Sequence, residues 1–190
     1  MIEPVQLGTV RDRVWGSLTA ALDERDHPMR TPVVATVDEH GSPRARVVVL
    51  RAVEPDAATL EFHTDTRSPK FASLRERPSL AWLFYDPRAM LQVRAEGTAT
   101  LHTDDAVADA SWTSTSLASR VPYMASVAPG RVVESAADGV HVRDEEHSRQ
   151  GRPFFCAVRS VIRRLDVLQL HPDGHRRVEV VEGGARWLAP

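Results

Sequence analysis

The sequence predicts a mainly β fold with flanking helices, in which an antiparallel sheet closes into a small barrel. Five segments with strand character follow one another between residues 31 and 102 with short connections. That density of strands is typical of a closed or nearly closed antiparallel barrel. Segments with helical spacing lie before, among and after these strands. A length of 190 residues suits one domain, so we expect residues 1–190 to fold as a single domain.

The helices are predicted from capping residues that precede apolar side chains at helical spacing. Residues 8–25 show such spacing after Thr9, a candidate N-cap. Residues 68–78 open with Ser68 at a capping position and Pro at the next, which predicts a short helix. Residues 104–119 are rich in Ala, Asp and Ser, which predicts one surface helix.

The strands are predicted from runs rich in Val, Leu and aromatic residues that are bounded by turn residues. In the first group they are residues 31–38, 44–51, 58–65, 79–86 and 90–102, and in the second group residues 153–170 and 176–182. Residues 129–152 between the groups are polar, charged and aperiodic. We therefore expect a long loop there, mobile over about 131–152.

Charge and composition exclude several classes of protein. A formal net charge of −2 gives no electrostatic case for nucleic acid or an anionic membrane as partner. The sequence has no apolar run of membrane-spanning length and no signal peptide pattern, so we expect a cytoplasmic protein. Cys156 is the only cysteine, which excludes an internal disulfide and favours a packing role in a strand. We expect no metal site.

The run "RARVVVLR", residues 44–51, brackets aliphatic side chains with arginines. Strand alternation places Arg44, Arg46, Val48 and Leu50 on one face. Partial burial of an arginine costs solvation free energy unless an anion or an ordered hydrogen-bond network compensates for it. Arg46 therefore needs a partner. That partner is either an anionic ligand or, as the plainer alternative, solvent or a carboxylate such as Glu61 or Glu96.

A phosphate is one such ligand, because the segment "HTDTRSPK", residues 63–70, runs from a strand end into a helix start. Thr64 and Ser68 supply hydroxyls, Lys70 supplies a charge, and the first turn of the helix supplies free N–H groups. These groups are candidates to share a phosphate with Arg46, while solvent or a carboxylate stays the plainer alternative on this pattern alone.

Four stretches together resemble the pyridoxamine 5′-phosphate oxidase-related family of FMN-binding split barrels. They are "RVVVLR" (46–51), "FHTDTRSPK" (62–70), "LQVRAEGTA" (91–99) and the terminal "RWLAP". The resemblance spans roughly residues 30–125 and 153–190. It implies a split β-barrel of the FMN-binding type, FMN as cofactor, and a homodimer that binds FMN at the subunit interface.

The resemblance also implies roles for particular residues. Arg46 and Lys70 resemble the family's phosphate ligands, with Thr64 and Ser68 in support, and Gln92 resembles the glutamine that reaches the flavin ring or its ribityl chain. The whole cofactor-binding set implied in this way is Arg46, Val47, Val48, Val49, Arg51, His63, Thr64, Ser68, Lys70 and Gln92. Arg51, Arg120 and Arg176 stand where contacts with an anionic substrate are expected.

The sequence departs from the vitamin B6 enzymes of the family at three places. The Ser-Arg-Lys triplet is Ser68-Pro69-Lys70, and Arg67 is a candidate substitute for the missing cation. A Tyr, an Arg and a Ser that hold the substrate phosphate correspond to Trp112, Ser116 and Arg120. The Arg-Leu-His-Asp-Arg signature is replaced by "HRRVEV", residues 175–180.

The chain is therefore more similar to the uncharacterised FMN-binding branch than to the true oxidases. We expect an FMN-dependent oxidoreductase that acts on a small anionic substrate. The alternatives are a non-catalytic module that binds flavin, heme or deazaflavin, and a genuine pyridoxamine 5′-phosphate oxidase.

Overall fold

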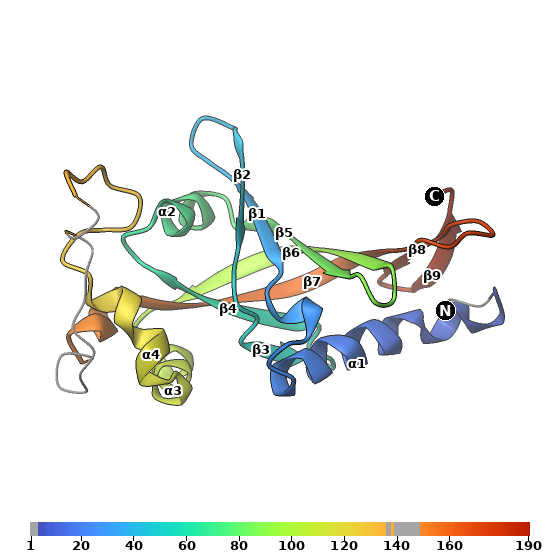
Figure 1. Ribbon diagram of the computed structural model, residues 1–190, viewed down its shortest axis with the longest axis horizontal. Helices are drawn as coiled ribbons and strands as arrows, with labels where there is room; N and C mark the ends of the chain where they lie inside the picture. Colours follow the sequence, from blue (N-terminus) through green and yellow to red (C-terminus); the bar gives the residue numbers. More distant parts are fainter. Residues whose placement is uncertain (1–3, 136–137, 139–148) are drawn as a thin grey trace.

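The computed structural model describes residues 4–135, 138 and 149–190 (Figure 1). In this part of the chain nine strands form one antiparallel sheet in the order β2-β1-β5-β6-β7-β4-β3, with β8 paired to β7 and β9 paired to β8. The strands are β1 Val33–Val37, β2 Pro43–Val47, β3 Ala52–Glu54, β4 Thr59–Asp65, β5 Ser79–Asp86, β6 Leu91–His102, β7 Phe155–Gln169, β8 Arg176–Val181 and β9 Gly184–Leu188. The helices are α1 Val10–Asp23, α2 Pro69–Glu76, α3 Ala106–Ser114 and α4 Leu117–Arg120, with shorter 3₁₀ segments η1 Pro4–Thr9, η2 Pro28–Arg30, η3 Val121–Met124 and η5 Arg149–Phe154.

One continuous segment, residues 43–54, closes the barrel. It begins as β2, which pairs with β1, and ends as β3, which pairs with β4. Strands β2 and β3 are the two ends of the strand order. Between them, Val48 donates its N–H to the Pro32 carbonyl at 2.9 Å and Arg51 donates to the Glu61 carbonyl at 2.8 Å. Because the same segment bonds to both ends of the sheet, the sheet returns on itself.

The barrel is split along the strand β7. One edge of β7 pairs with β6 over nearly its whole length. The other edge pairs with β4 over Phe155–Val161 and with β8 over Arg164–Gln169. Figure 1 shows β7 running the length of the molecule, with α3 and α4 at one end and β8 and β9 at the other. The predicted fold class, a mainly β split barrel with flanking helices, is confirmed.

The two faces of the sheet differ because side chains alternate along each strand. Trp82, Phe84 and Val34 point inward and are fully buried, and Trp82 donates its indole N–H to Ser160 Oγ at 3.0 Å. On the opposite side, the strand register places the side chains of β1, β2, β5 and β6 next to one another. This outer face comprises Val33, Ala35, Val37, Ala45, Val47, Leu83, Tyr85 and Gln92. Val47 is 64% exposed and Tyr85 is 43% exposed.

Two predicted elements have other bounds in the structure, and one short strand was missed. The strand predicted over 44–51 ends at Val47, where the chain leaves β1 to reach β4, and the three-residue strand β3 was not predicted. The helix predicted over 104–119 is two helices, because Thr115 and Ser116 adopt extended ψ angles of 126° and 153°. The Thr115 N–H then donates to the Trp112 carbonyl at 3.1 Å and ends α3.

The predicted loop over 129–152 is only partly covered by the structure. Residues 136–137 and 139–148 lie outside the described residues, so the mobility expected over about 131–152 stays a prediction. Arg149–Phe154 forms η5, a turn of 3₁₀ helix that leads into β7. No helix in the described part of the chain has the length and apolar character to cross a bilayer. Cys156 is buried in the core, as expected.

Candidate functional site

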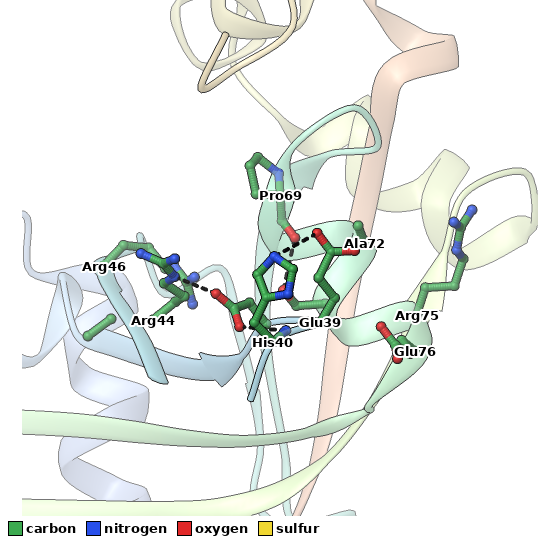
Figure 2. Close-up of a pocket in the computed structure, with 11 residues that line it drawn as sticks. Glu39, His40, Arg44, Arg46, Pro69, Ala72, Arg75 and Glu76 are labelled. Atoms are coloured by element: carbon green, nitrogen blue, oxygen red, sulfur yellow. Dashed lines mark hydrogen bonds and ion pairs between the residues drawn. The ribbon is translucent and has the colours of Figure 1, made fainter. Parts of the chain in front are cut away.

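A cleft of about 830 Å³ lies between β2 and helix α2. Its volume falls within the ~300–1,000 Å³ of ordinary small-molecule sites. Figure 2 shows Arg44 and Arg46 at one end of the cleft and Arg75 and Glu76 of α2 at the other. Arg44 is neutralised within the chain, because its Nε bonds to Asp38 at 2.8 Å.

Arg46 has no carboxylate partner among the described residues. Its guanidinium donates to Thr36 Oγ1 at 2.9 Å and to the Val34 carbonyl at 3.3 Å, both on β1. The side chain is half-buried, and burial followed by the charge of Arg44 lowers the pKa of Arg46. The alternative partners for Arg46, Glu61 and Glu96, both bond elsewhere: Glu61 to His63 and Glu96 to Arg164.

Lys70 lies in the first turn of α2 and also lacks a carboxylate partner in the described structure. Its Nζ donates to Thr64 Oγ1 at 3.0 Å, and Thr64 Oγ1 lies 3.1 Å from Ser68 Oγ. The pKa of Lys70 is lowered by burial first and by the charge of Arg46 second. Because the charge of Arg46 lowers the pKa of Lys70, the two cations lie within electrostatic range of each other.

Helix α2 presents its N-terminus to the same place. Ser68 is the N-cap, and its Oγ accepts from the Phe71 N–H at 3.4 Å. Pro69 has no N–H, so this helix start offers fewer free donors than the sequence suggested. The hydroxyls of Thr64 and Ser68, both buried, make up the remaining polar groups beside Lys70.

Arg67 does not take the place of the cation missing from the Ser-Pro-Lys triplet. Its guanidinium makes an ion pair with Asp65 at 2.7 Å and donates to the Ala125 carbonyl at 2.6 Å. It also stacks over the Phe154 ring at 3.8 Å from the centroid. These contacts tie the segment after α4 to the end of β4 and leave Arg67 engaged.

The backbone of residues 47–49 follows the open edge of β2. Val48 and Leu50 donate toward residues 30–32, so alternation directs the N–H of Val49 to the opposite side. No described residue accepts a hydrogen bond from the Val49 N–H. A half-buried, unpaired N–H is a donor available to a ligand.

A second polar cluster, the Glu61–His63 pair and its neighbours, lies between β4 and α3. His63 Nε2 and Glu61 Oε1 are 3.0 Å apart, with side chains 6% and 7% exposed. Ser111 on α3 donates to the same carboxylate oxygen at 2.8 Å. Arg159 on β7 approaches the other oxygen at 3.6 Å. Burial acts first on both pKa values; it lowers that of His63, whereas for Glu61 the bonds from His63 and Ser111 outweigh it and lower the pKa.

Arg51 lies near this second cluster and makes no described side-chain hydrogen bond or ion pair. Burial lowers its pKa, and its charge acts on His63 and on Tyr123 of η3. Tyr123 packs in an aromatic cluster with Trp112 and Phe155, and burial raises its pKa.

Three of the predicted site residues do not join these groups within one chain. Arg120 donates to the Trp112 and Thr113 carbonyls at 2.8 and 3.1 Å and stacks over the Trp112 ring, so it caps the end of α3. Gln92 lies on the outer face, opposite to the side that carries Arg46. Arg176 pairs with Gln169 at the far end of β7.

The sequence analysis did not identify Ser111, Thr115, Tyr123 and Arg159 as neighbours of predicted site residues. The signal that was present is the alternation in β4, where Glu61, His63 and Asp65 share a face. Three polar residues on one face of a buried strand indicate an internal polar cluster. Their partners come from α3, η3 and β7, and only the tertiary structure brings those elements to β4.

The structure is thus a split barrel in which two cations, Arg46 and Lys70, lie within electrostatic range of each other and have no carboxylate partner among the described residues. Residues 12–103 match the FMN-binding domain of pyridoxamine 5′-phosphate oxidase. The chain is 34% identical over 175 residues to the pyridoxine/pyridoxamine 5′-phosphate oxidase of Paraburkholderia phymatum, covering 88% of this chain and 80% of that one. It is 29% identical to the enzyme of the same name from Anaeromyxobacter dehalogenans, covering 92% and 90%.

The chain therefore belongs to the pyridoxamine 5′-phosphate oxidase family, and FMN is the cofactor of the matched domain. Solved structures share the fold over the whole chain. An FMN-binding protein from Nostoc punctiforme, described as related to pyridoxamine 5′-phosphate oxidase, has a TM-score of 0.77 at 23% identity, covering 100% of both chains. PhzG from Burkholderia lata, in complex with tetrahydrophenazine-1-carboxylic acid, has a TM-score of 0.73 at 20% identity, covering 99% of this chain and 93% of that one.

Proposed function

We propose that this protein is an FMN-dependent oxidoreductase that acts on a small anionic substrate. One observation carries the cofactor site: Arg46 and Lys70 are half-buried, lie within electrostatic range of each other, and have no described carboxylate partner. Two half-buried cations within electrostatic range repel, and each loses solvation, so an anion between them stabilises the arrangement. The phosphate of FMN is such an anion.

The residues present fit FMN in the following way. Arg46 and Lys70 hold the phosphate, and the hydroxyls of Thr64 and Ser68 complete its hydrogen bonds. The free Val49 N–H is a donor for the flavin ring. FMN, when bound, supplies the hydride chemistry, and the protein supplies binding, orientation and electrostatics.

Arg51 is the residue proposed to hold the substrate. It is half-buried and has no described side-chain partner, so it can bind a carboxylate or phosphate without breaking an existing bond. Arg120 is less suited to that role, because both of its described hydrogen bonds go to the carbonyls of α3.

The active form is proposed to be a homodimer. Two of the predicted substrate contacts, Arg51 and Arg176, lie far apart in one chain. The Arg51 N–H donates to the Glu61 carbonyl, and Glu61 lies opposite Arg159 of β7 in the strand register. Arg176 lies opposite Gln169 of the same strand. The stretch of β7 between those two partners spans about 33 Å at ~3.3 Å per residue. One chain thus cannot bring Arg176 to Arg51. The exposed apolar side chains of the outer face support a second copy as the occupant of that face.

The first test is the absorption spectrum of the purified protein, followed by titration with FMN. We expect a flavin spectrum, or quenching of flavin fluorescence with saturation. A colourless protein that leaves added FMN unquenched would refute the cofactor assignment, and a Soret or deazaflavin band would replace it. Bound FMN that NAD(P)H or small amines reduce no faster than free FMN would identify a binding module instead of an oxidoreductase.

A second candidate function is oxidation of pyridoxamine 5′-phosphate, favoured by the 34% identity to a relative of that name. The helix that should hold the substrate phosphate argues against it. Trp112 is buried against Phe155 and Tyr123, and Arg120 is bonded to the backbone. Incubation of the FMN-loaded protein with pyridoxamine 5′-phosphate and detection of the aldehyde product decides between the two. We expect little or no product.

A further inference from the structure

The hydrogen-bond partners of His63 suit its protonated form better than its neutral form. Nε2 faces the Glu61 carboxylate at 3.0 Å and is therefore a donor. Nδ1 faces Thr115 Oγ1 at 3.4 Å. Thr115 Oγ1 also lies 2.7 Å from the Ser111 carbonyl, which can only accept, and its single hydroxyl proton can serve one of these two contacts well. A neutral His63 needs that proton at Nδ1 and so competes with the shorter bond to Ser111, whereas an imidazolium donates at both nitrogens and leaves the bond to Ser111 in place.

The surroundings of His63 oppose that protonated form. Burial lowers the pKa of His63 below its ordinary value of 6.5; the hydrogen bond and the charge of Glu61 act in the opposite direction without reversing the shift, and the charge of Arg51 adds to the lowering. Other groups facing the cluster are paired or neutral. They are Glu61, Asp65 with Arg67, Arg159 with Glu54 and Glu61, and the uncharged Tyr123 and Cys156, while α3 contributes the hydroxyls of Ser111 and Thr115. Arg51 is thus the one unpaired charge among these described neighbours.

We propose that His63 is a positioning residue that takes up a proton when an anion binds Arg51, and that the imidazolium then fastens helix α3 to β4 through Thr115. An anion on Arg51 offsets the charge that disfavours imidazolium. The second ring N–H then donates to Thr115 Oγ1, while Nε2 stays bonded to Glu61. Anion binding and proton uptake are thereby linked, so each favours the other by the same factor.

The sign of this linkage follows from the direction of the pKa shift. A bound anion raises the pKa of His63 above its value in the anion-free protein, so the complex binds more protons than the free protein. Anion affinity therefore rises as the pH falls through the window of histidine titration and is flat above it. This inference uses the proposed function only in taking Arg51 as the residue that holds the substrate anion.

The test is an NMR titration of the His63 ring, assigned by loss of its resonances in His63→Gln, with sulfate as the probe. Sulfate keeps both charges across this pH range, so the probe itself does not titrate. We expect sulfate to raise the pKa of His63, and its affinity at the Arg51 site to rise about threefold or more between pH 8 and pH 5.5. In His63→Gln the affinity at this site, read from the Arg51 side-chain resonances, should lose that pH dependence and keep its value at pH 8.

Two further variants separate this linkage from the cofactor assignment. Arg51→Gln should raise the pKa of His63 with no ligand present, and Thr115→Val, which removes the acceptor, should lower it. Arg88→Gln is the matched control, since Arg88 is exposed and pairs with Asp86 at 3.3 Å in a distant turn. A His63 pKa that ignores both sulfate and Arg51→Gln refutes the proposal. FMN binding is scored separately by absorbance, so either conclusion can fail without the other.

Discussion

Replacement of Arg46 by Gln is the sharpest test of the cofactor site. Gln keeps a donor for Thr36 Oγ1, which Arg46 contacts at 2.9 Å, so the barrel wall should stay intact. The variant loses one charge-assisted hydrogen bond to the phosphate, which contributes about 1.5–3 kcal/mol. Since ~1.4 kcal/mol is tenfold in affinity, the Kd for FMN should rise by about 10- to 150-fold.

The assay is quenching of FMN fluorescence in a phosphate-free buffer, with circular dichroism to show that the variant is folded. Arg88→Gln, which removes an exposed arginine far from the cleft, should leave the Kd unchanged. The double variant Arg46→Gln, Lys70→Met should lose less affinity than the sum of the two single losses, because both side chains bind one phosphate. A Kd for Arg46→Gln within twofold of the parent, or strictly additive losses, would refute the shared anion site.

Three other variants test the barrel and its outer face. In Gly97→Ala the new Cβ would lie 2.3 Å from a carbonyl oxygen of β7 at the bulge, so thermal denaturation should show a loss of about 1–3 kcal/mol, whereas Gly16→Ala in α1, with nothing within 4 Å, should be neutral or slightly stabilising. Ser160→Ala leaves the buried indole N–H of Trp82 without its acceptor and should cost about 1–3 kcal/mol; an unchanged melting temperature would show that the bond contributes nothing. Leu83→Glu on the outer face should shift the protein toward monomers in analytical ultracentrifugation without unfolding it, and a persistent dimer would place the interface elsewhere.

The order and type of most elements could be predicted from the sequence because the barrel strands alternate strongly. The β5 residues Ser79–Asp86 coincide with the predicted strand, since each alternate side chain is buried. The break after Val47 could not be predicted in this way. The run of valines continues past the point where the chain changes partners from β1 to β4, and hydrophobic pattern does not record which strand is the neighbour.

The candidate site could be predicted only in part. Thr64, Ser68 and Lys70 contact one another at the start of α2, and the charge of Arg46 acts on Lys70, so the motifs that carry the resemblance lie near each other. Their joint binding of FMN stays a prediction. The capping role of Arg120 was not foreseen, because the break between α3 and α4 that turns its side chain to the α3 carbonyls depends on two extended residues. The separation of Gln92 and Arg176 from Arg46 follows from strand register, which the sequence does not display.

The pairing of β7 with strands made much earlier in the chain has a consequence for folding during synthesis. Two partners of β7 precede it in the chain: β4 ends 90 residues before β7 begins and β6 ends 53 residues before it, so these pairings are long-range. The third partner, β8, follows β7. While a ribosome is still synthesising the chain, β4 and β6 emerge with one edge unsatisfied and must wait for residues 155–169. The edges of β4 and β6 thus stay unpaired until β7 has been synthesised. A chain released or truncated before β7 should aggregate and depend on chaperones.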